Sequence, residues 1–474
     1  MTDFRKLLNV EQHEAVTAGD GPLLVLAAAG TGKTRTLVYR VAYLVEQGLP
    51  PESLLLLTFT NRAAREMLER AKEAAGPSVG NLWSGTFHHI CNRFLRRYAH
   101  KLGYGGDFSI LDRDDSRSVL SACMKEVVKD AKEFPKKDVI GALISEAANR
   151  DLGVGDVLDL NKEIDADPDA VIRIENLYRE TKLKNNQMDF DDLLVNGLRL
   201  LCEHAPVREH YQEQFRHVLI DEYQDTNLLQ AKMVDILAGK WKNVMAVGDD
   251  FQCIYSWRGA DFRNIMEFPD RWPGCRIVKL EQNYRSVPEV LEVANACIQG
   301  NPEQFQKTLR AVRAPQSRPH AYFLRDGDEQ ARGVISLINR YINRGYSPKD
   351  IAVLYRAHFH SIELQMALPR SHLPYNITSG VGVFEQAHTK DVIAFLKVCA
   401  GASDQLAFCR LLGMLPGVGE KSAQKVWDKL GGTFDPSDAA QREVVAGALR
   451  ATVRGNWLVL DELFRANAAE NLTE

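Results

Sequence analysis

Uninterrupted apolar runs alternate with helical patterns along the chain. The apolar run LLVLAAA at 23–29 leads into a glycine loop, the helical pattern TLVYRVAYLVEQG at 36–48 and a second apolar run, LLLLTFT, at 54–60. Similar runs recur as HVLI at 217–220, NVMAV at 243–247 and IAVL at 351–354. Apolar runs without polar alternation are typical of parallel strands that are buried on both faces. The pattern therefore predicts an α/β fold with parallel sheets that include these runs as strands.

Two long stretches lack this strand signal and predict helical insertions. From Ile90 to Asp189 the chain is charged and helical in its spacing, with breaks at Pro135 and Gly153. From Ser379 to Glu474 it is helical again, apart from the glycine-rich segment LPGVGEKSA at 415–423. We expect the first stretch to interrupt the first α/β domain, and the second to be a further insertion.

Composition narrows the class of protein. With 474 residues, 45% of them hydrophobic, the chain has the length of about three domains. No apolar run is long enough to span a membrane and the first residues lack the apolar core of a signal peptide, so we expect a cytoplasmic protein with no membrane partner. The eight cysteines form no C-x-x-C pair, which favours reduced thiols over a zinc or cluster site. The net charge of -4 gives no bulk attraction for nucleic acid, so any such binding must depend on local sites.

The segment AAAGTGKT at 27–34 is a candidate phosphate site. Gly30 and Gly32 allow backbone N–H groups to wrap a triphosphate, Lys33 supplies charge for its outer phosphates, and Thr34 can hold Mg²⁺. Ala27 stands where a P-loop usually begins with glycine. Glycine turns between a strand and a helix are common, but a lysine at such a helix start indicates an anion. The predicted nucleotide-binding segment comprises Ala28, Ala29, Gly30, Thr31, Gly32, Lys33 and Thr34.

A second candidate half-site is HVLIDEYQD at 217–225, where an apolar strand ends in two acids. Asp221 is placed to reach Mg²⁺ through water, and Glu222 to polarise an attacking water. An acidic strand end that caps a helix is common. A capping role alone does not explain Asp221 and Glu222 when they follow a P-loop in the same sheet.

With these elements in place, the order of motifs resembles that of superfamily 1 DNA helicases of the UvrD/Rep family over essentially the whole chain. LNVEQ resembles the adenine-reading Q motif, which implies a base contact from Gln12, and AAAGTGKTR resembles motif I, with Arg35 close to the nucleotide. LEQNYRS resembles motif IV, in which Tyr284 would stack on adenine and Arg285 would act as an arginine finger. The resemblance implies ATP with Mg²⁺ as cofactors, and catalytic roles for Lys33, Asp221, Glu222, Gln252 and Arg285.

Further segments resemble the DNA-facing motifs of the family. They are TFTNRAAREM (motif Ia), GTFHHICNRFLR (motif Ib), DFDDLL, and VGDDFQCIYSWRGA (motif III), whose Gln252 would sense the γ-phosphate. The residues implied to contact single-stranded DNA are Phe59, Thr60, Asn61, Thr86, His88, Phe190, Tyr255, Trp257 and Arg258. Taken singly, each of these aromatic residues could belong to a hydrophobic core. The segment IYSWRG is different, because two aromatics, an arginine and a glycine together predict an exposed loop.

The segment LPGVGEKSA resembles a helix-hairpin-helix. Gly417 and Gly419 would then offer backbone N–H groups to a phosphate of duplex DNA. An ordinary glycine turn between two helices is nearly as well supported by the sequence. YRAHFHSIEL at 355–364 matches the next segment of the family, with Arg356 and Glu363 as neighbours of nucleotide or DNA.

The resemblance implies RecA-like P-loop NTPase motor domains with parallel sheets, each carrying a mainly helical insertion. The expected division is 1–89 and 191–280 for the first motor domain, 90–190 for its insertion, 281–378 for the first part of the second motor domain, and 379–474 for the second, incomplete insertion. Motifs V and VI of the family are absent from the sequence. A truncated chain, a naturally split or degenerate protein, and a partner chain that completes the fold remain open as explanations.

Two functions from different classes follow. The first is an ATP-dependent helicase that moves 3′ to 5′ on single-stranded DNA and acts at single-strand/duplex junctions in repair or replication, with this chain alone an impaired ATPase. The second is a non-catalytic adaptor that binds nucleotide and DNA. The intact Lys33, Asp221, Glu222, Gln252 and Arg285 favour the first, and the missing motifs favour the second. Repair proteins or a complementing chain would be the protein partners. A small-molecule kinase or GTPase would leave the aromatic DNA motifs unexplained.

Overall fold

The computed structural model describes residues 3–128, 134–378, 387–400 and 404–470. Its contacts divide the chain into two compact units, Met1–His320 and Ala321–Glu474, which are considered separately. None of the helices in the described ranges is long and apolar enough to cross a membrane.

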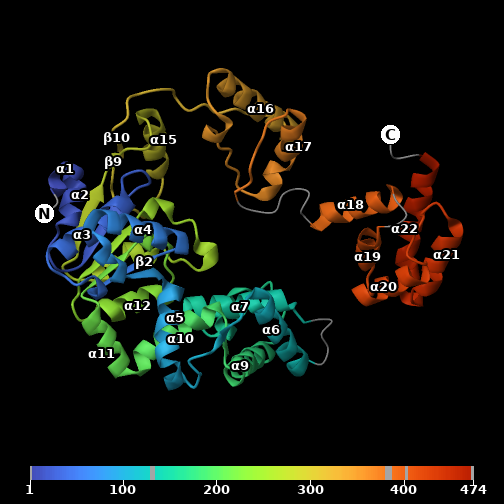
Figure 1. The fold of residues 1–474 in the computed structure, drawn as a ribbon, viewed down its shortest axis with the longest axis horizontal. Helices are drawn as coiled ribbons and strands as arrows, with labels where there is room; N and C mark the ends of the chain where they lie inside the picture. Colours follow the sequence, from blue (N-terminus) through green and yellow to red (C-terminus); the bar gives the residue numbers. More distant parts are fainter. Residues whose placement is uncertain (1–2, 129–133, 379–386, 401–403, 471–474) are drawn as a thin grey trace. The chain divides into compact units, whose positions relative to one another are not determined.

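A six-stranded, all-parallel sheet forms the centre of the first unit (Figure 1). The strand order is β3-β2-β6-β7-β1-β8, and in register Leu23 of β1 lies beside Met245 of β7 while Leu54 of β2 lies beside His217 of β6. This confirms the α/β fold with a parallel sheet. The strands are β1 (Leu23–Ala27), β2 (Leu54–Thr58), β3 (Trp83–Thr86), β6 (His217–Ile220), β7 (Val244–Gly248) and β8 (Arg276–Leu280).

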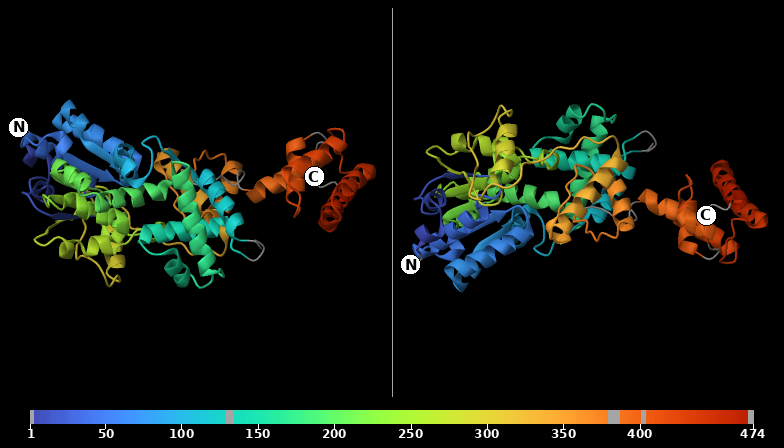
Figure 2. Two further views of the ribbon diagram at one scale, coloured as in Figure 1. Left: turned by 90° about the horizontal axis from the view of Figure 1, so that it is seen from below. Right: turned by 90° about the horizontal axis from the view of Figure 1, so that it is seen from above.

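Alternate residues of each central strand face opposite hydrophobic cores, because successive side chains of a strand point to opposite faces. Leu23 and Val25 belong to the core that α3 (Lys33–Glu46) and α4 (Asn61–Ala75) cover. Leu24 and Leu26 belong to the core that α5, α10, α11 and α12 cover (Figure 2). Burial on both faces is the physical reason for the uninterrupted apolar runs in the sequence. The helices of the second core are α5 (Phe87–Tyr98), α10 (Phe190–Glu203), α11 (Ala205–Gln214) and α12 (Leu228–Ala238).

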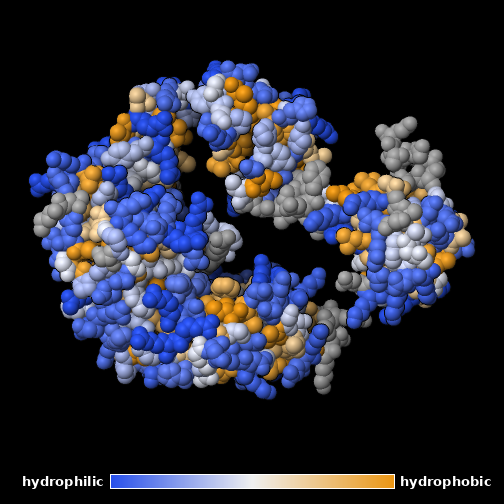
Figure 3. Space-filling model, viewed as in Figure 1, coloured by the Kyte–Doolittle hydropathy of each residue, from blue (hydrophilic) through white to orange (hydrophobic). Residues whose placement is uncertain are grey.

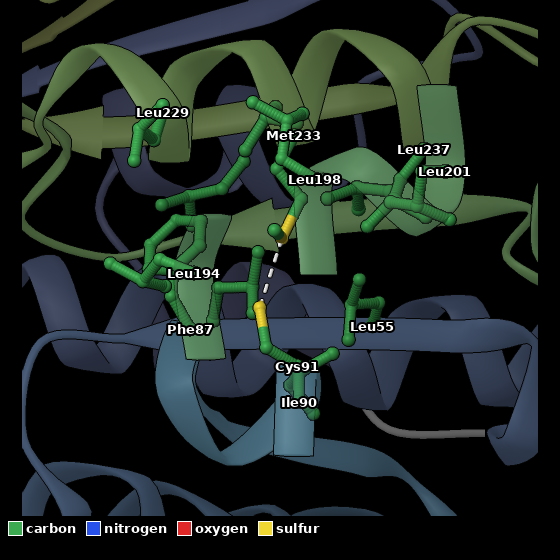
Figure 4. Packing of buried hydrophobic residues seen from close by; sticks show 14 of the residues in the cluster. Leu55, Phe87, Ile90, Cys91, Leu194, Leu198, Leu201, Leu229, Met233 and Leu237 are labelled. Carbon is green, nitrogen blue, oxygen red and sulfur yellow. Dashed lines mark hydrogen bonds between the residues drawn. The ribbon is translucent and has the colours of Figure 1, made fainter. Parts of the chain in front are cut away.

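The second core is tightly packed where α5, α10 and α12 meet. The Cys91 thiol lies 3.5 Å from the Met233 sulfur at this point (Figure 4). A Cβ atom built on Gly197 of α10 would lie 2.8 Å from the Cys91 sulfur, so glycine allows α5 and α10 to approach closely.

Helices with their own core occupy most of the stretch between α5 and α10. Residues from α6, α7, α8 and α9 form this core, and a two-stranded parallel pair, β4 (Ser109–Ile110) with β5 (Gln187–Met188), joins its ends. The helices are α6 (Arg113–Val127), α7 (Lys137–Arg150), α8 (Val154–Leu160) and α9 (Pro168–Lys184).

Short elements at the edges of the sheet carry several motif residues. β9 pairs in parallel with β10, which lies 28 residues further along the chain by the register of Gln282 with Arg310. These elements are α1 (Phe4–Leu7), α2 (Val10–Val16), η1 (Pro51–Ser53), η2 (Pro77–Asn81), η3 (Ala99–Leu102), η4 (Tyr223–Asp225), η5 (Asp250–Gln252), η6 (Ser256–Arg258), α13 (Arg263–Met266), α14 (Phe268–Arg271), β9 (Gln282–Asn283), α15 (Pro288–Ile298) and β10 (Arg310–Ala311).

Helices without strands make up the described part of the second unit. α16 and α17 pack against each other, and α18 to α22 enclose a separate core that includes Trp427, Phe434 and Trp457. The elements are α16 (Gly327–Asn343), η7 (Pro348–Asp350), η8 (His358–Ser361), α17 (Ile362–Arg370), α18 (Ala387–Ala400), α19 (Gln405–Gly413), α20 (Glu420–Lys429), α21 (Ala439–Ala448) and α22 (Ala451–Glu470).

The predicted strand at 351–354 is wrong. This segment has no strand assignment, and Leu354 is 93% exposed. A strand needs a neighbouring backbone to accept its hydrogen bonds, and the described residues of this unit provide none. Apolar side chains consequently remain on the surface of the part that carries α16 and α17, among them Phe323 at 96% exposed (Figure 3).

Candidate nucleotide and DNA site

The glycine loop predicted to hold phosphate lies between β1 and α3. Gly30 and Gly32 have φ of 85° and 92°, in the left-handed region that favours glycine, and Gly32 is the N-cap of α3. Lys33 is therefore the first residue of the helix, where backbone N–H groups point outward and favour an anion. The Thr31 hydroxyl donates to the Ala28 carbonyl (2.7 Å) and closes the loop on itself.

Gln12 bonds to the backbone of this loop. Its Nε2 donates to the Thr31 carbonyl (2.9 Å), its side chain is buried, and a Cβ atom on Gly32 would come within 2.6 Å of that nitrogen. Gln12 also forms a capping box with Asn9 at the start of α2. The base contact expected of Gln12 stays a prediction. Arg35 donates to the Leu7 carbonyl (2.7 Å) and so joins α3 to the first helix.

Lys33 and the predicted acids meet although they are distant in sequence. The Lys33 Nζ lies 2.5 Å from Glu222 Oε2. β1 and β6 run parallel in one sheet, so their carboxyl ends lie at the same edge. Glu222 has φ of 50°, a conformation that costs a non-glycine residue about 1 kcal/mol or more, and sequence patterns give no sign of it.

Three acids surround this point, and the pKa values of two of them are raised. Burial and the adjacent Glu222 raise the pKa of Asp221 to about 7, and the same causes raise the pKa of Asp225 to about 6. One carboxylate oxygen of each, Asp221 Oδ1 and Asp225 Oδ1, is buried without a hydrogen-bond partner. Together with Thr34 they line a cavity of about 390 Å³.

This donor set fits Mg²⁺, because hard oxygen ligands without other partners are what that ion requires. The described residues contain no group of three or more His, Cys, Asp or Glu side chains that could hold a metal ion by themselves. Asp225 was not predicted from the sequence, although it closes the same DEYQD segment.

Gln224 connects the acids to the loop that follows β7. Its Nε2 donates to Glu222 Oε2 (2.9 Å), and its Oε1 accepts from the Asp249 backbone N–H (3.0 Å). Asp249 in turn accepts a hydrogen bond from Gln252 Nε2 (2.6 Å). We call this chain of contacts, Lys33–Glu222–Gln224–Asp249–Gln252, the polar relay. Sequence analysis missed Gln224 and Asp249, although both stand in segments that resemble motifs.

The segment that bears Tyr284 and Arg285 follows β9 and is attached directly to the glycine loop. The Tyr284 N–H donates to the Gly30 carbonyl (2.9 Å), and Asn283 Nδ2 donates to the Ala29 carbonyl (2.7 Å). Asn283 is buried, and its Oδ1 accepts from the backbone N–H groups of Arg285 (2.9 Å) and Ser286 (2.8 Å). Asn283 was missed because nothing in the local pattern distinguishes an amide that bonds to backbone far away in the sequence.

The aromatic side chains predicted to contact DNA form two groups. Phe59 stacks on Tyr255 with ring centroids 5.8 Å apart, and Tyr255 lies 6.3 Å from Trp257, which is 68% exposed. Phe190 is 57% exposed beside His88, at a centroid distance of 6.2 Å. The exposed loop predicted from IYSWRG is therefore present. The Arg258 side chain lies outside the described part of the structure.

Hydroxyl groups predicted to contact DNA also have roles within the fold. Thr60 caps α4 and Thr86 caps α5 through their Oγ1 atoms. The Thr86 hydroxyl also reaches Asn61 Oδ1 (3.5 Å), which places these residues at the same end of the sheet as Phe59. Their contacts with DNA stay predictions.

In the second unit, Gly417 has φ of 89° and Gly419 is the N-cap of α20. Gly417 lines a small cavity of about 250 Å³ together with Lys425, Lys429 and Arg450. The contact of this segment with a duplex stays a prediction, as do roles for the exposed Arg356 and for Glu363 of α17.

A glycine loop closed by a lysine, facing carboxylates at the ends of parallel strands, defines a P-loop NTPase. Comparison with known families finds the UvrD/REP helicase N-terminal domain over residues 8–273 and the UvrD-like helicase C-terminal domain over residues 278–434. The chain belongs to the UvrD/Rep helicase family. It is similar to the ATP-dependent DNA helicase PcrA of Staphylococcus aureus (strain Mu50 / ATCC 700699), with 37% identity over 88% of this chain and 57% of that protein.

The protein of the same description from Staphylococcus epidermidis (strain ATCC 12228 / FDA PCI 1200) is 36% identical over 90% of this chain and 58% of its own length. The chain thus spans somewhat more than half the length of the curated relatives that it matches.

Proposed function

We propose that the chain is the ATP-binding and single-strand-gripping part of a DNA helicase, which moves 3′ to 5′ and unwinds duplex DNA in repair or replication. The observation that carries the proposal is the polar relay. It runs without a break from the phosphate loop to Gln252, three residues before Tyr255, and so connects nucleotide to the aromatic loop.

In this proposal each relay residue has a chemical task. Lys33 neutralises the outer phosphates of ATP, Glu222 accepts a proton from the attacking water, and Gln252 donates to the γ-phosphate. Arg285 adds positive charge opposite the phosphate loop. Thr34, Asp221 and Asp225 would hold Mg²⁺, which would neutralise charge on the phosphates.

Binding of a phosphate changes the contacts of Lys33, because it competes with Glu222 for the Lys33 ammonium group. Glu222 then keeps its bond to Gln224, which also fixes the backbone of Asp249. A shift at the phosphates therefore reaches the loop of Tyr255 and Trp257, which alternately grips and releases bases. A Gln252→Ala variant that hydrolysed ATP and still moved along DNA normally would count against this coupling.

The substrate is single-stranded DNA and its junctions with duplex. Stacking of bases on Phe59, Tyr255, Trp257 and Phe190 is independent of sequence. Gly417 and Gly419 bind a duplex phosphate ahead of the motor, and Gly417 lines a cavity together with three cationic side chains. Repair proteins, or a chain that completes the second motor domain, are the proposed protein partners, and the proposed location is the cytoplasm.

A second candidate is a non-catalytic adaptor that binds nucleotide and DNA. The segment at 351–354, which is not hydrogen-bonded in a sheet, favours this candidate, because an unformed second motor domain would hydrolyse ATP poorly. ATP hydrolysis with and without single-stranded DNA distinguishes the two, with Lys33→Ala as the blank. DNA-stimulated turnover followed by strand separation on a 3′-tailed duplex supports the helicase. Nucleotide binding without turnover supports the adaptor.

A further inference from the structure

Lys307 is a fully buried lysine in the segment that leads from α15 to β10. Its Nζ lies 2.7 Å from Asp249 Oδ1, also pairs with Asp250 Oδ1, and is 3.7 Å from the centroid of the Phe251 ring. The lysine side chain is 0% exposed, and those of Asp249 and Asp250 are 3% and 2% exposed. Lysine is rarely buried in this way without partners that compensate its charge. All three partners lie on the short loop that ends at Gln252.

Asp249 divides its two oxygens between Lys307 and the relay. Oδ1 accepts from Lys307 and from the Phe251 N–H (3.2 Å), and Oδ2 accepts from Gln252 Nε2 (2.6 Å). A buried carboxylate that lost its cation would reorient toward water or take up a proton. The direction of the Gln252 amide therefore depends on Lys307 through Asp249, which bonds to both residues.

The segment around Lys307 is also fixed at its other end. The Phe305 N–H donates to Asp250 Oδ2 (2.9 Å), and the Thr308 N–H donates to Glu281 Oε1 (2.8 Å). β10 then pairs with β9, whose Asn283 bonds to the phosphate loop and to the Arg285 N–H. Residues 305–311 consequently join the loop of Gln252 to the strand that leads to Arg285.

We propose that Lys307 is a positioning residue for ATP hydrolysis: through Asp249 it orients the amide of Gln252, and through β10 it keeps that amide in register with Arg285. This rests on the proposed function of Gln252 and Arg285 at the γ-phosphate. The Lys307 side chain contacts Asp249, Asp250 and Phe251 rather than the nucleotide loop. Its loss should therefore lower the rate of hydrolysis more than the affinity for nucleotide.

A buried ion pair that serves only stability is the alternative. Its loss would lower the melting temperature and disturb the surroundings without a specific link to Gln252. Lys182 provides a matched control, since it too is buried between two aspartates, with its Nζ 2.5 Å from Asp189 Oδ2 and 2.6 Å from Asp192 Oδ2, but in another part of the first unit.

Two measurements on the full chain test the proposal. In hydrogen–deuterium exchange, Lys307→Met is expected to accelerate exchange of the amides of 249–258 about tenfold, with β1 unchanged. Lys182→Met should accelerate exchange near 182–192 and leave 249–258 unchanged. In steady-state hydrolysis with single-stranded DNA, Lys307→Met should lower kcat by about 10- to 100-fold, the scale of a misplaced reacting group, and change the Kd for a fluorescent ADP by less than about twofold.

A double-mutant cycle with Gln252→Ala separates positioning from stability. If Lys307 acts through Gln252, the double variant is no more than about twofold slower than Gln252→Ala alone. Additive losses in kcat, or unchanged exchange of 249–258 in Lys307→Met, would overturn the proposal. If Lys307→Met does not fold, the pair Asp250→Asn with Lys307→Met removes one charge of each sign, and the same outcomes apply to it. Absence of turnover in the wild-type chain would contradict the proposed function, whereas the exchange measurement would still decide the role of Lys307.

Discussion

Replacement of Glu222 by glutamine is expected to tighten ATP binding while it slows hydrolysis. The positive charge of Lys33 is engaged by Glu222 at 2.5 Å. ATP must compete with that carboxylate for the lysine. Glutamine has the same shape and can still accept the hydrogen bond from Gln224, but it carries no charge.

The size of the effect follows from the exposure of the pair. The Lys33 side chain is 11% exposed and that of Glu222 is 33% exposed, so solvent screens the attraction considerably. A partly exposed pair of this kind contributes about 1 kcal/mol, the upper end of measured values for exposed pairs. Its removal should lower the Kd for ATP about fivefold. Loss of a general base should lower kcat by about 10²- to 10⁴-fold.

Titration with a fluorescent ATP analogue and steady-state hydrolysis give the two numbers. Glu66→Gln is the matched control, because Glu66 lines the same cavity but pairs with Arg70 on α4. It removes the same charge without freeing Lys33, so affinity should change less than twofold. An equal decrease in the Kd for ATP in Glu66→Gln and Glu222→Gln would refute the reasoning, since the decrease would then come from the total charge of the cavity. Unchanged affinity in Glu222→Gln would refute it as well.

Three further outcomes are expected. Gly197→Ala should lower the free energy of unfolding in urea by about 1–3 kcal/mol, because its Cβ would lie 2.8 Å from the Cys91 sulfur, and the loss should shrink in a Cys91→Ala background. Phe190→Ala should weaken single-stranded DNA binding by about 1–3 kcal/mol in fluorescence anisotropy, whereas Phe323→Ala, at a still more exposed phenylalanine in the other unit, should not. Burial lowers the pKa of His217 to about 4, so the unfolded state binds more protons between pH 4 and 6.5 and stability falls as pH falls. From pH 7 to pH 5 the loss should be about 2 kcal/mol in chemical denaturation, and His217→Gln should abolish that part of the pH dependence.

The chemistry of the phosphate site could be predicted because its signals are local. Gly30, Gly32 and Lys33 form a continuous pattern between an apolar strand and a helix, and Asp221 ends another apolar strand. Parallel strands bring their carboxyl ends to one edge, so an α/β interpretation sufficed to join them.

Other features could not be predicted, because they depend on contacts between distant residues. Asn283 bonds to a carbonyl 254 residues away, and Lys307 to a carboxylate 58 residues away. Neither belongs to a periodic pattern. The strand predicted at 351–354 was wrong because the prediction used only local composition. The run has the composition of a buried strand, but a strand also requires a neighbouring backbone, which the described residues of its unit do not provide.

Under the proposed function, the distribution of charge allows the relay to respond to nucleotide within the first unit. Around Lys33 three carboxylates, Asp221, Glu222 and Asp225, face one ammonium group, whereas Lys307 is enclosed between two buried carboxylates. The first cluster is open to the cavity and can exchange partners with phosphate at low cost. The second is closed and holds the loop of Gln252 in place. A relay with one exchangeable end and one fixed end transmits a change at the phosphates to the aromatic loop rather than dissipating it.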